Sequence, residues 1–154
     1  MYFNILQQSL WMFEKIIHNK TIIAIVIRAE FQKSGIEFFT PPDFSQQLGY
    51  MQRPKGYFIE PHVHNIVERT VTHTQEVLHI KNGRIKIDLF DDQRLFIKEI
   101  ILLKGDTVLL ASGGHSVEML DDSELIEIKQ GPYLNDDDKV RFTPATVKDE
   151  QAKI

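Results

Sequence analysis

Two histidines separated by one residue are the first candidates for chemistry in this chain. They lie in the segment 56–64, GYFIEPHVH, where an extended backbone directs His62 and His64 to the same face. Glu76 falls on the apolar, inward-facing side of the next predicted strand, and His115 follows a glycine pair. From these positions we expect the three histidines and one glutamate to converge. Imidazole and carboxylate groups together can bind a divalent metal, and imidazole can transfer protons near neutral pH.

Most of the elements that must position these residues are predicted to be β-strands. The apolar run 22–27, IIAIVI, indicates a buried strand, and the alternation in 84–89 places Ile85, Ile87 and Leu89 on a core face. Asn82-Gly83 predicts a two-residue turn that pairs the strand 75–81 with the strand 84–89. Short β-type segments interrupted by turn residues predict an antiparallel barrel or sandwich.

Three further segments have their own expectations. Apolar residues at spacings of three and four predict an amphipathic helix over 4–18, and Pro41-Pro42 indicates a connection or an edge within 30–44. In 124–130, ELIEIKQ, alternation allows either the isoleucines or the charged set with Leu125 to face inward.

Composition excludes several classes of protein. The 154 residues have a net charge of −4, no cysteine and 42% hydrophobic residues, which predicts one ordinary globular domain without disulfides or thiolate metal sites. The acidic balance argues against nucleic-acid binding. No apolar run approaches the roughly 20 residues that span a bilayer, and the amino end lacks a secretory signal pattern. We therefore expect a cytoplasmic protein without a membrane partner.

Residues from about 46 to 133 resemble the cupin superfamily. Its first motif has five residues between a glycine and His-x-His, as from Gly56 to His62-Val63-His64, and six residues between a glutamate and a glycine, as from Glu76 to Gly83. Eleven residues separate His64 from Glu76, whereas the usual pattern has three or four.

The second cupin motif is matched more loosely. Gly105 and His115 fit it, whereas Ala111 replaces its proline, Met119 replaces its asparagine, and the interval before the histidine is one residue short. The resemblance implies a double-stranded β-helix, or jelly-roll barrel, with the N-terminal helix outside it. Expected boundaries are an extension at 1–45 that packs on the barrel or a partner subunit, a barrel at 46–142 and a disordered tail at 143–154.

By the same resemblance, His62, His64, Glu76 and His115 are the ligands of one divalent ion inside the barrel. These ligand types do not distinguish Fe, Mn, Zn or Ni. Glu68 competes with Glu76 as the carboxylate ligand, and His73 is a weaker substitute.

The resemblance implies a metalloprotein that acts as an enzyme of the dioxygenase or isomerase type on a small polar or anionic molecule. Arg84, Lys86 or Arg69 would attract an anionic substrate. The alternatives are a non-catalytic small-ligand binding or sensing module, and a metal-independent sugar-nucleotide isomerase or epimerase with histidine as the base. We also expect a homodimer, because cupins commonly associate through sheet edges.

Overall fold

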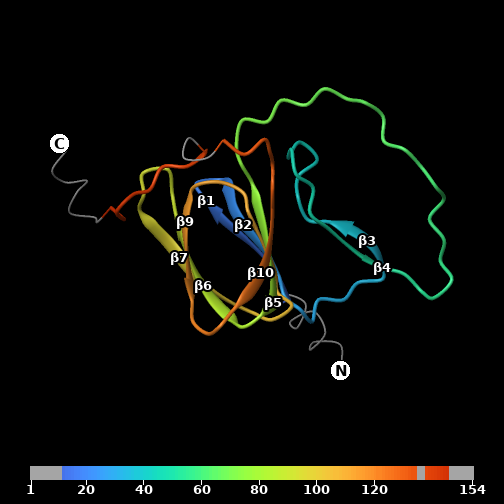
Figure 1. Cartoon of the computed structure of the whole chain (residues 1–154), viewed down its shortest axis with the longest axis horizontal. Helices are drawn as coiled ribbons and strands as arrows, with labels where there is room; N and C mark the ends of the chain where they lie inside the picture. Colours follow the sequence, from blue (N-terminus) through green and yellow to red (C-terminus); the bar gives the residue numbers. More distant parts are fainter. Residues whose placement is uncertain (1–11, 135–137, 146–154) are drawn as a thin grey trace. The chain divides into compact units, whose positions relative to one another are not determined.

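The computed structural model describes residues 12–134 and 138–145, in which nearly all regular structure is β-strand (Figure 1). The chain divides into two compact units, of which unit 1 comprises residues 1–31 and 74–154 and unit 2 comprises residues 32–73. The mainly β class predicted from the sequence is confirmed. The described strands form separate antiparallel sheets and not a closed barrel, and the cupin jelly-roll stays a prediction. In the described part of the chain, no helix has the length and apolar character needed to cross a membrane.

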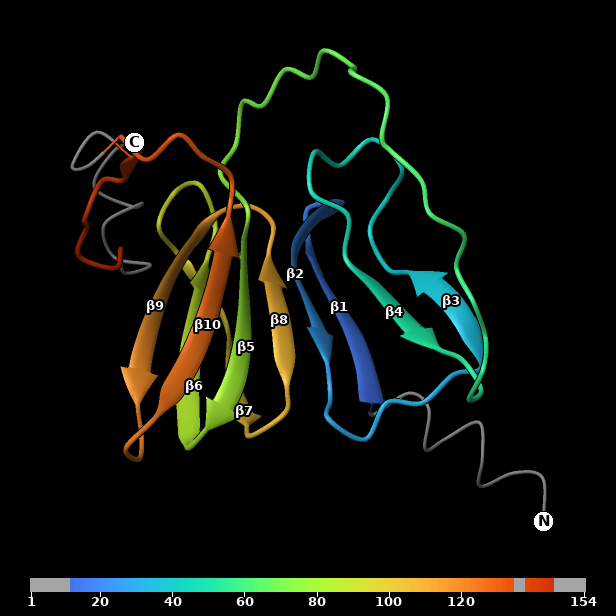
Figure 2. The same ribbon diagram turned by 45° about the vertical axis from the view of Figure 1, so that its right-hand side comes forward.

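Unit 1 contains two antiparallel sheets (Figures 1 and 2). The five-stranded sheet has the spatial order β1 (Phe13–His18), β2 (Thr21–Ile27), β8 (Thr107–Leu110), β5 (Glu76–Asn82), β10 (Glu124–Lys129). The three-stranded sheet has the order β7 (Phe96–Leu103), β6 (Arg84–Phe90), β9 (Gly114–Met119).

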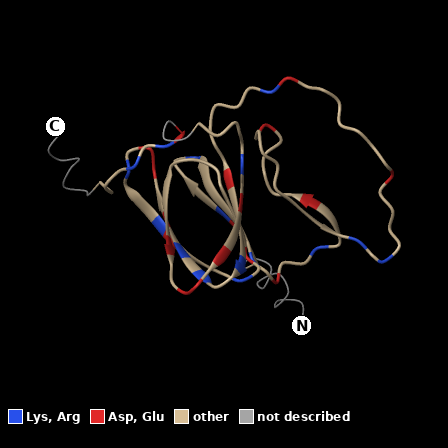
Figure 3. Ribbon diagram, viewed as in Figure 1, with Lys and Arg blue, Asp and Glu red and all other residues tan. Residues whose placement is uncertain are grey.

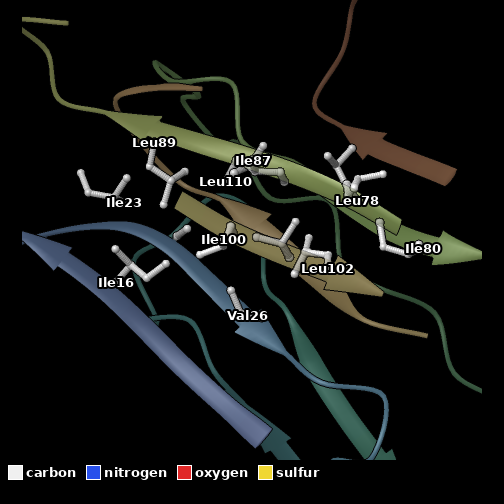
Figure 4. Close-up of a cluster of buried hydrophobic side chains, with 13 residues drawn as sticks. Ile16, Ile23, Val26, Leu78, Ile80, Ile87, Leu89, Ile100, Leu102 and Leu110 are labelled. Carbon is white, nitrogen blue, oxygen red and sulfur yellow. The ribbon is translucent and has the colours of Figure 1, made fainter. Parts of the chain in front are cut away.

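Apolar side chains from both sheets of unit 1 pack together in one core (Figure 4). Ile85, Ile87 and Leu89 alternate with polar residues along β6 and are buried, as the sequence predicts. The run 23–27 in β2 is buried at every position, which confirms the predicted buried strand. Full burial of side chains of this size contributes about 1.5–3 kcal/mol each to folding.

β5 and β6 do not form the predicted hairpin. β5 pairs with β8 and β10, whereas β6 pairs with β7 and β9, so Gly83 connects the two sheets. Its φ is 84°, and an added Cβ atom would lie 2.2 Å from Ser123 Oγ and 2.5 Å from the carbonyl oxygen of Asp122. Asn82 belongs to β5 and a bend at Gly83 leads directly into β6, so the predicted two-residue hairpin turn is wrong, and pairing with other strands decided where the chain went.

The predicted N-terminal helix is wrong for residues 13–18, which form β1. This strand pairs with β2 across a turn in which Asn19 and Lys20 have φ angles of 47° and 67°. Ile16 is buried whereas the adjacent Ile17 is 58% exposed, so apolar residues occupy both faces of this strand and their spacing resembled that of a helix. Residues 4–11 of the predicted helix lie outside the described residues.

Unit 2 contains one two-stranded sheet, in which β3 (Gly35–Phe38) pairs with β4 (Gly49–Gln52). The proline pair at 41–42 lies in the connection between these strands. Residues 53–73 form no helix or strand, and Phe58, Val63 and Ile66 in this segment are at least 73% exposed. The histidine-containing part of unit 2 therefore lacks the sheet framework of unit 1.

Two predicted boundaries differ from this division. The expected extension 1–45 is divided between the units, because β1 and β2 belong to the five-stranded sheet and residues from 32 onward belong to unit 2. The predicted tail begins at residue 143, yet the backbone N–H of Ala145 donates to the carbonyl oxygen of Arg94 at 2.9 Å. Residues 146–154 of that tail lie outside the described residues.

Candidate functional site

A cavity of about 870 Å³ lies in unit 1. Its walls come from β5 and β10 of one sheet, from β6 and β9 of the other, from the turn after β6 and from the segment 138–144. Ligand sites for small molecules typically occupy about 300–1,000 Å³, so the cavity has the size of such a site.

Glu76 and His115 meet on the wall of this cavity. Glu76 lines it together with Leu78 of the same strand, which confirms that this carboxylate faces inward. His115 lies opposite Leu89 in the pairing of β9 with β6, so it shares the inner face of that buried leucine. Glu76 Oε2 is 3.1 Å from His115 Nε2, and the side chains are 19% and 32% exposed.

The partners of Glu76 hold it in its charged form. The hydrogen bond from His115 lowers the pKa of Glu76, burial acts in the opposite direction, and the nearby positive charges lower it further. The net result is a pKa of Glu76 below its usual range. At neutral pH the cavity wall therefore presents a carboxylate.

β10 directs its charged residues into the cavity. Leu125, Glu127 and Lys129 lie opposite Ile80, Leu78 and Glu76 of β5, respectively, and so share their inward face. The isoleucines at 126 and 128 lie on the other face and are 46% and 54% exposed. The structure thus resolves the alternation that the sequence left open.

Lys129 is surrounded by three carboxylates. Its Nζ atom lies 3.3 Å from Glu127 Oε1, 3.6 Å from Asp138 Oδ2 and 3.7 Å from Glu76 Oε1. Desolvation lowers the pKa of Lys129, but the hydrogen bond and charge of Glu127 and the charges of Glu76 and Asp138 raise it above its ordinary value overall. The ammonium group therefore stays charged beside the His115–Glu76 pair.

The cations that line the cavity differ from those proposed from the sequence. Arg84 Nε is 3.3 Å from Asp121 Oδ2, and Lys86 Nζ is 2.6 Å from Glu118 Oε2. Both residues alternate with the buried Ile85 and Ile87 and lie outside the cavity lining. Arg84 and Lys86 are therefore not part of the lining of this cavity, and the predicted role of Arg84, Lys86 or Arg69 in attracting an anionic substrate stays a prediction.

The basic residues of the lining come from the turn after β6, from β10 and from the segment 138–144 (Figure 3). They are Arg94, Lys129, Lys139 and Arg141.

His62 and His64 lie together in unit 2. Their ring centroids are 5.4 Å apart, and His62 Nδ1 is 2.9 Å from the carbonyl oxygen of Glu60. Both residues are exposed, in a segment without strand structure. Glu68 and His73 are also exposed, and His73 Nδ1 is 3.0 Å from Thr72 Oγ1.

The predicted four-residue metal site stays a prediction. Of its members, Glu76 and His115 approach each other in unit 1, and His62 and His64 do so in unit 2. Among residues 12–134 and 138–145, no group of three or more His, Asp or Glu side chains suited to a metal ion is found.

Sequence reasoning found part of the cavity and missed the rest. Glu127 and Lys129 were recognised as an alternative inward set, because their alternation was visible. Asp138 and Arg94 gave no signal, since each reaches the cavity from a segment without periodic pattern. Comparison of the chain with family models, curated proteins and solved structures finds no match.

Proposed function

We propose that this protein binds a small polar molecule in the cavity of unit 1 and exchanges a proton with it through His115 and Glu76. The observation that carries the proposal is the 3.1 Å approach of these two side chains on the wall of a cavity of about 870 Å³. Such a cavity, with titratable groups converging on it, has the features of a ligand or active site.

The geometry assigns different tasks to the two residues. His115 Nε2 faces the carboxylate, which leaves Nδ1 as the nitrogen that accepts a proton from a ligand. Glu76 then stabilises the imidazolium that forms, and return of the proton to another atom of the ligand restores the starting state. The reaction class is a proton transfer, as in isomerisation or epimerisation, with no net redox change.

Binding is tested first, by thermal shift with a panel of uncharged polyols, sugars and hydroxy amides. Compounds that raise the melting temperature of the wild type should bind about tenfold more weakly to His115→Gln, because the hydrogen bond between His115 and the ligand is lost. His79→Gln is the matched control, since His79 is on the opposite face of β5, where its Nδ1 is 3.0 Å from Thr107 Oγ1. Equal binding to both variants would contradict the assigned site.

Proton exchange is tested on the compounds that bind. Incubation in deuterated water should incorporate deuterium at one ligand carbon, and His115→Gln should slow this by about 10²–10⁴-fold, the usual contribution of general acid–base catalysis. Binding without exchange would reject the catalytic part and leave a ligand-binding module.

Binding of a divalent metal is the second candidate function. It is favoured by the approach of two predicted ligands, His115 and Glu76, and by the contact of His62 Nδ1 with a carbonyl oxygen, which leaves Nε2 as the ligand atom. The ammonium of Lys129, 3.7 Å from Glu76 Oε1, opposes a second cation at that carboxylate. The donors of unit 1 alone are therefore a poor fit to a metal.

Elemental analysis of protein purified without added metal separates these candidates. A four-residue site requires stoichiometric metal in the wild type and in His79→Ala, and its loss in both His115→Ala and the double variant of His62 and His64 with alanine. Metal that persists in His115→Ala would place the ion elsewhere, and only trace metal in the wild type would reject this candidate.

Homodimerisation and a cytoplasmic location stay predictions. β10 pairs with β5 alone among the described strands, and Ile126 and Ile128 on it are exposed. An exposed apolar edge strand is a common site of association. Sedimentation at micromolar concentration should give the mass of a dimer, and a monomer would contradict the prediction.

A further inference from the structure

We infer that the ligand of the cavity in unit 1 carries an anionic group, a carboxylate or a phosphate, and that Arg94 binds this group. The inference rests on the proposed small-molecule site and specifies the chemical class of its ligand.

Four cations, Arg94, Lys129, Lys139 and Arg141, line the cavity together with six carboxylates, those of Glu76, Asp88, Asp91, Asp92, Glu127 and Asp138. Lys129 is balanced by Glu76, Glu127 and Asp138 at distances of 3.3–3.7 Å. In contrast, Arg94, Lys139 and Arg141 have no carboxylate within 4.0 Å among the described residues. The cavity lining thus holds cations that no ion pair of the described chain neutralises.

Arg94 is the most precisely held of these cations. Its guanidinium carbon lies 5.5 Å from the ring centroid of Phe142, and that ring packs edge-on against Phe90 at 5.4 Å. All three residues line the cavity. Stacking on an aromatic ring fixes the plane of a guanidinium while leaving its N–H donors free for a carboxylate or phosphate.

The backbone at Arg94 supports a role in binding rather than in the turn. Its φ is 69°, in the left-handed region where glycine is favoured. The turn is already held by Asp91 Oδ1, which accepts hydrogen bonds from the N–H groups of Gln93 and Leu95 at 2.9 Å. A glycine would satisfy this turn with less strain, so the side chain of Arg94 needs another explanation, and a strained residue on a cavity wall is typical of a functional site.

The neighbouring acidic residues leave this assignment intact. Asp91 also lies 3.6 Å from His18 Nε2, and Asp88 Oδ2 accepts a hydrogen bond from Ser116 Oγ at 3.4 Å. Asp88 and Asp91 therefore have partners other than Arg94, whereas Asp92, which also lines the cavity, has no ion pair among the described residues.

The test is a titration with inorganic phosphate and with acetate, followed by amide chemical shifts of the full chain. In the wild type, the amide resonances of Gly113 and Gly114, which line the cavity, should shift when either anion binds. Arg94→Gly should lower the affinity for both anions about tenfold, because a charge-assisted hydrogen bond is lost. Arg94→Lys should retain part of the affinity, because it keeps the charge but not the planar donor pair.

Lys20→Gly is the matched control. Lys20 also has a positive φ, 67°, and its replacement removes one positive charge outside the cavity lining. Both glycine variants should keep or raise the melting temperature, since both relieve a left-handed non-glycine residue, but only Arg94→Gly should lose anion affinity.

Three results with the Arg94 and Lys20 variants would overturn the inference. They are unchanged anion affinity in Arg94→Gly, an equal loss in Lys20→Gly, and a melting temperature that falls in Arg94→Gly but not in Arg94→Lys while anion affinity persists. Uncharged ligands whose binding depends on His115 but not on Arg94, together with no anion binding, would remove this inference and leave the proposed function. Anion binding that depends on Arg94, without any ligand whose binding depends on His115, would reject the proposed function and leave the anion site.

Discussion

Two pairs of functional side chains in this protein are held in very different ways. Glu76 and His115 come from strands of two different sheets and meet at 3.1 Å on the wall of a cavity. His62 and His64 are neighbours in sequence, and they lie in an exposed segment without strands. Sequence proximity brings the second pair together, whereas the first pair depends on the register of two sheets. Only the contact between Glu76 and His115 therefore depends on the packing of a hydrophobic core.

Removing the hydrogen bonds that Asp106 accepts within unit 1 should have the largest effect on the free energy of unfolding. Asp106 is 3% exposed and accepts hydrogen bonds from Arg28 Nη1 at 2.7 Å, from the Ala29 N–H at 2.9 Å and from the Leu103 N–H at 3.0 Å. Asp106→Ala should lower the free energy of unfolding by about 4 kcal/mol, because it leaves the N–H groups of Ala29 and Leu103 without their acceptor and leaves the Arg28 guanidinium with only the carbonyl oxygen of Ile101.

The measurement is urea denaturation, with unfolding monitored by far-ultraviolet circular dichroism. The comparison variant in unit 2 is Glu37→Ala, which removes the partly exposed ion pair with Lys33 and should cost about 0–1 kcal/mol. An equal loss in the free energy of unfolding for the two variants would contradict the expectation that contacts in unit 1 contribute more to stability than those in unit 2.

A pair of glycines extends the comparison between the units. Gly83 and Gly56 have similar φ angles, 84° and 86°, but an added Cβ atom at Gly83 would meet Ser123 and the backbone of Asp122, whereas at Gly56 it would meet nothing within 4 Å. Gly83→Ala should therefore cost about 3 kcal/mol, and Gly56→Ala only the conformational cost of about 1 kcal/mol. Chemical denaturation of both variants measures this, and a similar loss in the two would mean that the turn at 120–123 yields.

Acid should weaken the His115–Glu76 pair. The hydrogen bond from His115 is the main reason that the pKa of Glu76 is lowered in the folded chain. The pair therefore contributes stability above the ordinary carboxyl pKa of about 4.3, and this contribution disappears as the pH falls through the lowered pKa. The difference in melting temperature between the wild type and Glu76→Gln should be full at neutral pH and should shrink below pH about 4.

Glu60→Gln in unit 2 is the control for this profile. The Glu60 carboxylate has no cation within 4.0 Å among the described residues, so its variant should follow the wild type at each pH. A difference for Glu76→Gln that is constant from acid to neutral pH would show that the charge of Glu76 does not contribute.

The smallest effect is expected at the exposed histidines. Replacement of His62 and His64 by glutamine, in a segment without strands, should change the free energy of unfolding by no more than about 0.5 kcal/mol, as is usual for exposed positions. His115→Gln should cost more, because it leaves Glu76 without its hydrogen-bond donor. If the His62 and His64 variants were the more destabilised, these two residues would have a structural role that the contacts of unit 2 do not explain.

Local patterns predicted much of the wall on which Glu76 lies. The alternation along β6 gave the buried face of Ile85 and Ile87, and the same rule placed Glu76 inward in β5. Burial imposes this two-residue period directly on the chain, so it is readable without knowledge of the partner strands. This rule did not identify β1, because the buried Ile16 and the exposed Ile17 put apolar residues on both faces of the strand and gave the appearance of a helix.

The side chains that surround Glu76 could not be predicted from the two-residue period. Lys129 and Asp138 lie 53 and 62 positions further along the chain, and their approach depends on the pairing of β10 with β5 and on the path of a segment without strand structure. Arg94 likewise lines the cavity from a turn. Distances of this kind depend on contacts that no short window of sequence contains.

By itself, the sequence determined a mainly β protein, the buried strand at 22–27 and the inward direction of Glu76, since burial leaves a periodic trace along each strand. Only the tertiary structure decided that β5 pairs with β8 and β10 instead of β6, that the charged face of β10 points inward and that His115 reaches Glu76. The reason is that the choice of a strand's partners depends on the packing of residues far apart in the chain, and alternation is the same for every possible partner.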